Sequence, residues 1–106
     1  MRFMSDPKIA VLGLFHKEAF FTPYYQSYYG GLFGNENIYI LGDPINDPFL
    51  YMFEKANLLD LGATCQSEYA VHIHMVKETQ IELLKRYDIV VFAEADEFIF
   101  ADPDKY

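Results

Sequence analysis

The chain has 106 residues, of which 52% are hydrophobic and 18% aromatic, and this composition excludes an intrinsically disordered protein. The length is that of one domain. Sixteen acidic against eight basic side chains give a net charge of −8, which repels a nucleic-acid backbone and excludes nucleic acid as an expected partner. Cys65 is the single cysteine, so an internal disulfide is excluded and a reducing compartment is indicated. No apolar stretch approaches the ~20 residues that span a bilayer, and we expect a cytoplasmic protein without a transmembrane segment.

Short apolar runs alternate with segments of helical spacing along the chain. The apolar runs predict strands at residues 8–15, 37–42, 58–65 and 89–93. The segments between them predict helices from about residue 22, at 48–57 with Asp47 as N-cap, and at about 68–86. This alternation predicts right-handed βαβ units and therefore an α/β fold with three layers, α/β/α, around a mostly parallel sheet.

The first predicted helix is unusually aromatic. Pro23 fits its first turn, so the helix should begin near Thr22, and the glycines at 30, 31 and 34 should end it. Aromatic and aliphatic residues recur in it at helical spacing, at positions 21, 24, 25, 28 and 32. Such a stripe is typical of core packing, and stacking of an acceptor or contact with a membrane surface are the alternatives. Any part of it left exposed would favour a homo-oligomer.

The last predicted strand ends abruptly in carboxylates, at Glu94, Asp96 and Glu97. Ligands of open α/β sheets bind outside the carboxyl ends of the strands. Glu94 and Asp96 are two residues apart and therefore share a face in extended backbone. A divalent cation relieves the repulsion between two such carboxylates and can bridge them to phosphate oxygens. The pattern predicts a metal site at Glu94 and Asp96; the alternative is a strand end that is acidic only for solubility.

The segment Glu94-Ala95-Asp96-Glu97-Phe98 resembles the D-x-D-E-F element of family 2-like glycosyltransferases with the GT-A fold, with Glu94 in place of the first Asp. Phe15-His16-Lys17-Glu18 resembles the K-N-E start of the family's first βα loop, with His16 where the family often has Asn. Residues 32–40 are similar to the family's passage into its second strand. The resemblance extends over nearly the whole chain.

This resemblance implies a GT-A, Rossmann-like nucleotide-binding half that takes part in sugar transfer from a nucleotide-diphospho-sugar to an unknown acceptor, which is a glycan, a lipid or a protein. The residues implied in donor binding are Phe15, His16, Glu18, Asp43 and Glu94. The residues implied in binding Mn²⁺ or Mg²⁺ are Glu94 and Asp96. Family members continue with an acceptor half that supplies the catalytic base, so residues 1–106 would be a fragment or a truncated form of a longer transferase, and the catalytic residues are unknown.

Other sites and functions remain open from the sequence. His72 and His74 would share a face on a strand and could chelate a transition metal, whereas on a helix they diverge by about 200°. The chain has no P-loop and no dinucleotide-binding glycine fingerprint. The alternative to an enzyme is a non-catalytic α/β interaction module with an acidic strand end. A receiver-like phosphoryl transfer site could use Asp43 but has no evident lysine opposite it.

Overall fold

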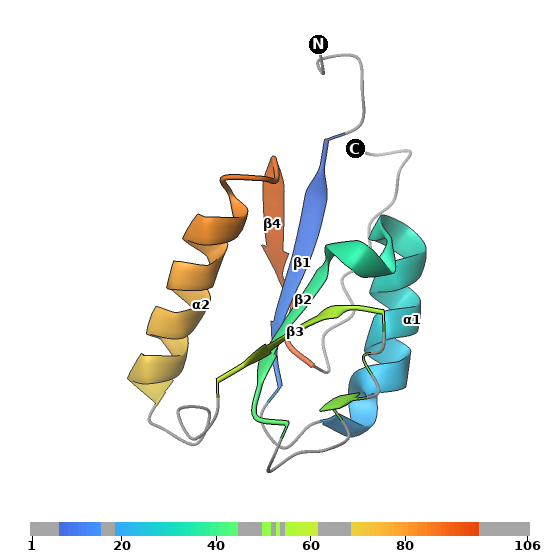
Figure 1. The fold of residues 1–106 in the computed structure, drawn as a ribbon, viewed down its shortest axis with the longest axis horizontal. Helices are drawn as coiled ribbons and strands as arrows, with labels where there is room; N and C mark the ends of the chain where they lie inside the picture. The colour runs from blue at the N-terminus through green and yellow to red at the C-terminus, as the bar shows by residue number, and fades with distance from the viewer. Residues whose placement is uncertain are drawn as a thin grey trace.

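The computed structural model describes residues 7–15, 19–44, 50–51, 53, 55–61 and 69–95. Within them, strands and helices follow one another along the chain, and β2 and β3 are consecutive (Figure 1). In chain order they are β1 (Ile9–Leu14), α1 (Thr22–Phe33), β2 (Ile38–Gly42), β3 (Asn57–Asp60), α2 (Tyr69–Leu83) and β4 (Ile89–Phe92). Two 3-10 turns, η1 (Ala19–Phe21) and η2 (Asn35–Asn37), precede α1 and β2.

The strands form one four-stranded sheet in the order β3-β2-β1-β4. Every neighbouring pair is parallel, with Val11 of β1 opposite Ile38 on one side and Val91 on the other. The predicted α/β class and parallel sheet are therefore confirmed. The strand order reverses at β1, since β2 and β3 follow on one side and β4 returns to the other. The doubly wound dinucleotide-binding sheets begin with the same order, 3-2-1-4.

Each face of the sheet is covered by one helix, α1 on one side and α2 on the other (Figure 1). Side chains alternate between the faces along each strand, so neighbouring residues enter different cores. The core under α1 contains Val11, Phe15, Tyr25, Tyr29, Ile38, Ile40, Leu50, Phe53, Ala93 and Ala95. The core under α2 contains Ala10, Leu12, Tyr39, Leu41, Leu83 and Tyr87.

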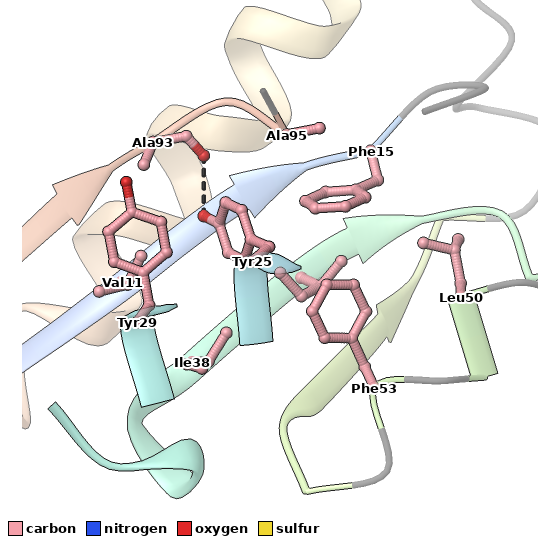
Figure 2. Packing of buried hydrophobic residues seen from close by; sticks show 10 residues of the cluster. Val11, Phe15, Tyr25, Tyr29, Ile38, Leu50, Phe53, Ala93 and Ala95 are labelled. Atoms are coloured by element: carbon pink, nitrogen blue, oxygen red, sulfur yellow. Dashed lines mark hydrogen bonds between the residues drawn. The ribbon is translucent and has the colours of Figure 1, made fainter. Parts of the chain in front are cut away.

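The core under α1 is built from edge-to-face aromatic pairs (Figure 2). The ring of Phe15 lies 5.0 Å from that of Tyr25 and 5.1 Å from that of Phe53, at interplanar angles of 87° and 83°. Such pairs contribute about 0.5–1.5 kcal/mol each beyond the area that they bury, because the positive edge of one ring meets the negative face of the other. This cluster holds α1 against β1.

The helix α1 differs from its prediction in two respects. It continues through Gly30 and Gly31 to Phe33, so that of the three predicted glycines only Gly34 caps it. The φ of Gly34 is 92°, which glycine adopts readily, and its N–H donates to the carbonyl oxygen of Gly30 at 2.9 Å. The predicted stripe also combined two neighbouring rows of the helix, and within each row the residues are four apart. Tyr25 is buried, whereas Tyr24, one residue earlier and about 100° around the helix, is 66% exposed.

The third strand and the second predicted helix also need correction. Asn57, expected to end a helix at residues 48–57, instead begins β3, which is shorter than the predicted strand at 58–65. Its side-chain N–H groups donate to the carbonyl oxygens of Glu36 at 2.9 Å and Ile38 at 3.1 Å, and this ties β3 to the start of β2. Most of residues 45–54 lies outside the described residues. The helix predicted at about 68–86 is confirmed as α2, and within the described part of the chain no helix has the length and apolarity needed to cross a bilayer.

Candidate functional site

The carboxyl edge of the sheet brings three of the predicted site residues to one side of the molecule. Phe15 follows β1, Asp43 follows β2 and Glu94 comes two residues after β4. Parallel strands end together at one edge, and α1 and α2 both begin at this edge (Figure 1). The sheet order reverses between β1 and β4, and it is outside such a reversal that open α/β sheets bind their ligands. Glu94 therefore stands at the position in this fold that is best suited to a ligand.

Glu94 is held outward by its two neighbours. Ala93 and Ala95 are 0% and 1% exposed and belong to the core under α1, while Glu94 between them is exposed. The N–H of Ala93 donates to the carbonyl oxygen of Leu12 at 3.0 Å, so β4 stays joined to β1 up to the residue before the carboxylate. Small side chains on both sides let the backbone lie close to the core while the longer side chain reaches away from it.

A buried tyrosine hydroxyl of α1 also holds the end of β4 in place. The hydroxyl of Tyr25 in α1 donates to the carbonyl oxygen of Ala93 at 2.8 Å (Figure 2). The side chain reaches Ala93 across Gly13 of β1, where an added Cβ would lie 2.6 Å from the tyrosine oxygen. Gly13 thus leaves the space that the hydrogen bond needs. The sequence placed Tyr25 in the aromatic stripe but did not predict its contact with Gly13 and Ala93, although a glycine inside a strand pattern is a signal of a close approach.

Phe15 and Asp43 are buried rather than open to solvent. Phe15 is 0% exposed and its backbone N–H donates to the carbonyl oxygen of Leu41 at 2.9 Å, so its side chain packs in the core beneath the edge. Asp43 is 2% exposed. Thr22, the first residue of α1, is 0% exposed, and its hydroxyl has no hydrogen-bond partner among the described residues. Sequence reasoning did not single out Thr22.

The remaining predicted ligands are not placed. His16, Glu18 and Asp96 lie outside the described residues, so the predicted metal pair and the predicted loop contacts stay predictions. Where residues are described, no three His, Cys, Asp or Glu side chains are close enough to hold a metal ion. His72 and His74 both lie on α2, and their spacing of two residues puts them on different sides of that helix, so the strand-based argument for a histidine pair does not apply.

The opposite, amino edge carries a chain of hydrogen bonds. Tyr87 donates from its hydroxyl to Oδ1 of Asn37 at 2.8 Å and lies 2.9 Å from the hydroxyl of Tyr39, which must then be the donor to Tyr87. Nδ2 of Asn37 donates to the carbonyl oxygen of Phe33 at 2.7 Å. Burial raises the pKa of Tyr87 to about 12, because it removes water that would stabilise the phenolate. The Tyr87 hydroxyl is therefore protonated at physiological pH, and its hydrogen bonds join the segment after α2 to β2 and η2.

Comparison with models of known protein families, with curated proteins and with solved structures gave no match.

Proposed function

We propose that this chain is the nucleotide-sugar-binding domain of a metal-dependent glycosyltransferase. The observation that carries the proposal is the exposed carboxylate of Glu94 at the end of β4, beside the reversal of strand order at β1. In an open parallel sheet this is the place where a bound nucleotide is expected. The resemblance of residues 94–98 to the D-x-D-E-F element adds independent support, because it falls on this strand end.

In the proposed site Glu94 and Asp96 supply carboxylate oxygens to Mn²⁺ or Mg²⁺, which are hard cations that prefer oxygen ligands. The bound cation would neutralise the charge that develops on the departing nucleoside diphosphate. The two buried alanines and the Tyr25 hydroxyl fix the backbone that carries Glu94, so the chain contributes a ligand that is already in position.

The other implied donor contacts come from the loop after β1 and from Asp43. His16 and Glu18 would lie under the nucleotide base, and Asp43 would hold its polar edge. The burial of Asp43 limits its access to a ligand, and the burial of Phe15 leaves that residue a role in supporting the loop. In this proposal the sugar is delivered to an acceptor with the help of residues that the resemblance assigns to a further half of the enzyme.

A non-catalytic interaction module is the second candidate, and the exposed aromatic side chains of η1 and α1 favour it. Tyr24 is 66% and Phe20 64% exposed, and exposed aromatic groups are enriched where proteins bind partners. This candidate predicts no metal-dependent nucleotide binding.

Calorimetric titration of UDP and GDP, with and without Mn²⁺, separates the two candidates. We expect Mn²⁺-dependent binding to the wild type and its loss in Asp96→Ala. Asp60→Ala is the matched control, because it removes an exposed carboxylate at the end of β3, two strands away from β1. No binding to the wild type, or an equal loss in both variants, would contradict the proposal, the second because it would reflect net charge alone.

A further inference from the structure

The strand β4 lies at one margin of the sheet, and among the described residues it pairs with β1 alone. The N–H groups of Ile89 and Ala93 point toward β1, because they donate to carbonyl oxygens of that stretch of chain at 3.2 and 3.0 Å. Neighbouring residues of a strand direct their backbone groups to opposite sides, so Val90 and Phe92 direct theirs to the outer side of β4, away from β1. Such a row of backbone donors and acceptors is a template for one more strand.

The two margins of the sheet differ in how they oppose such pairing. β3, at the other margin, contains the polar Asn57 and the exposed, charged Asp60. Charged residues on a marginal strand oppose pairing with another chain. β4 has the sequence IVVF, without a charged or polar side chain, and Ile89 is 42% exposed. The composition of β4 therefore favours pairing along its outer side.

The side of α2 above the outer side of β4 is apolar as well. The other side of this helix faces β2 and β3, since Glu78 and Glu82 line a hollow together with residues of those strands. At about 100° per residue, Ile73 and Leu84 lie roughly opposite these glutamates, and they are 44% and 52% exposed. Leu84 still belongs to the helical turn, because its N–H donates to the carbonyl oxygen of Gln80 at 2.9 Å. Apolar surface thus continues from β4 onto the neighbouring side of α2.

A second copy of the chain fits this surface, because the surface is complementary to itself. A two-fold axis at Val91, perpendicular to the sheet, makes the two β4 strands antiparallel and sets Val90 of one copy opposite Phe92 of the other. Each such pair exchanges both of its N–H···O=C hydrogen bonds. The same axis makes the two α2 helices antiparallel neighbours on one face of the joined sheet. The Ile73 end of each helix then meets the Leu84 end of the other.

Charge limits this association without excluding it. The net charge of −8 repels a second copy, and the pairing sets Asp88 of one copy opposite Glu94 of the other. At physiological salt the Debye length is about 8 Å, so much of the long-range repulsion is screened. The row of α2 that meets its counterpart contains Lys77 and Gln80 between its two apolar residues and no carboxylate.

We propose that the chain forms a two-fold symmetric dimer in which β4 pairs with β4 and α2 packs against α2, so that the two four-stranded sheets become one. The proposal does not rest on the nucleotide site. The axis turns the carboxyl edges of the two copies in opposite directions, so the two candidate sites lie at opposite ends of the joined sheet.

Sedimentation equilibrium of the chain at physiological salt tests the dimer, and we expect a monomer–dimer equilibrium. Leu84→Lys should weaken dimerisation at least about tenfold, because it brings a charged group into a contact that excludes water. Ile81→Lys is the matched control. Ile81 is 54% exposed, close to the 52% of Leu84, but lies on the outward side of α2, so its replacement should leave the dissociation constant nearly unchanged. Both variants change the net charge equally, so charge alone cannot separate them.

Amide hydrogen exchange locates the contact. The amides of Val90 and Phe92 should become protected as the protein concentration rises. The amide of Leu58, which holds the corresponding place on the outer side of β3, should exchange equally at all concentrations.

Four results would overturn the proposal. The chain could still be monomeric at about 1 mM, where even weak pairs associate. Ile81→Lys could weaken dimerisation as much as Leu84→Lys. Val90 and Phe92 could be protected independently of concentration, which would mean that another part of the same chain covers β4. Finally, the chain could dimerise without protecting these two amides, which would mean that the copies meet at another surface.

Discussion

The two edges of the sheet are built differently. At the amino edge polar groups are joined to one another: the backbone N–H of Lys8 donates to Oδ2 of Asp88 at 2.7 Å, and Tyr39, Tyr87 and Asn37 form a continuous hydrogen-bonded chain. At the carboxyl edge Glu94 is exposed, and its backbone is steadied by hydrogen bonds made by the residue before it.

This difference separates stability from function. Groups whose hydrogen bonds are all made within the fold contribute to folding and have little left for a ligand. Glu94 is exposed at the end of β4 on a backbone that the residue before it holds in place, and an exposed carboxylate on a rigid backbone is suited to a ligand. We therefore propose that the amino edge serves mainly stability and that the carboxyl edge carries the ligand site.

The largest expected effect comes from the core beneath the carboxyl edge. Phe15→Ala should lower the free energy of unfolding by about 3–5 kcal/mol, because it removes a fully buried ring that packs against two others. Urea denaturation measures the change, and Phe20→Ala, at a 64% exposed position, should stay within about 0.5 kcal/mol of the wild type. Equal losses in the two variants would show that Phe15 is not a packing residue.

The brace between α1 and β4 should give the next largest effect. Gly13→Ala should cost about 1–3 kcal/mol, because the new Cβ would meet the Tyr25 hydroxyl and lie 3.2 Å from the carbonyl oxygen of Ala93. Tyr25→Phe removes the hydroxyl, so the double variant should be more stable than the sum of the two single losses indicates. Strict additivity in this double-mutant cycle would contradict the assigned contact.

The tyrosine pair at the amino edge predicts a pH dependence. The folded-state pKa of Tyr87, about 12, is above its ordinary value of 10.0, so the folded state holds the proton more tightly than the unfolded state. The resulting stability is fully present below pH 10.0 and is lost as the pH rises toward about 12, by roughly 2 kcal/mol. Tyr87→Phe should remove this part of the alkaline loss, seen as a flatter dependence of the urea midpoint on pH. An unchanged slope in the variant would show that Tyr87 is not the group responsible.

The smallest expected effect is that of a surface ion pair on the last turn of α2. Nζ of Lys85 lies 3.0 Å from Oε1 of Glu82, but both side chains are mostly exposed, at 65% and 68%. Glu82→Gln should change the stability by no more than about 0.5 kcal/mol, and added salt should reduce even that difference. A change above about 1 kcal/mol would contradict the expectation that this exposed pair contributes little to stability.

The sequence was sufficient to predict the strands that became β1, β2 and β4, because each is a short apolar run, buried in β1 and β2 and half-buried in most of the edge strand β4. It was also sufficient to place Glu94 at a strand end. The sequence could not tell which tyrosines of α1 face the core. Two neighbouring rows of the helix, each made of residues four apart, are both aromatic, and only packing against the sheet decides which row is buried. The Gly13–Tyr25–Ala93 contact joins residues 68 positions apart and was not accessible to local pattern analysis. The burial of Asp43 was missed because position along a strand does not fix exposure.

The central claim is that the carboxyl edge at β1 and β4 binds a metal–nucleotide complex, and Mn²⁺ itself can report the position. In an NMR spectrum of the ¹⁵N-labelled chain with UDP, paramagnetic Mn²⁺ broadens the amide signals close to where it binds, and Mg²⁺ serves as the diamagnetic control. We expect the signals of Leu14, Ala93 and Glu94 to broaden first, while those of Lys8 and Asp88 at the other edge stay sharp. Broadening centred on Asp88, or spread evenly over the acidic surface, would contradict the account.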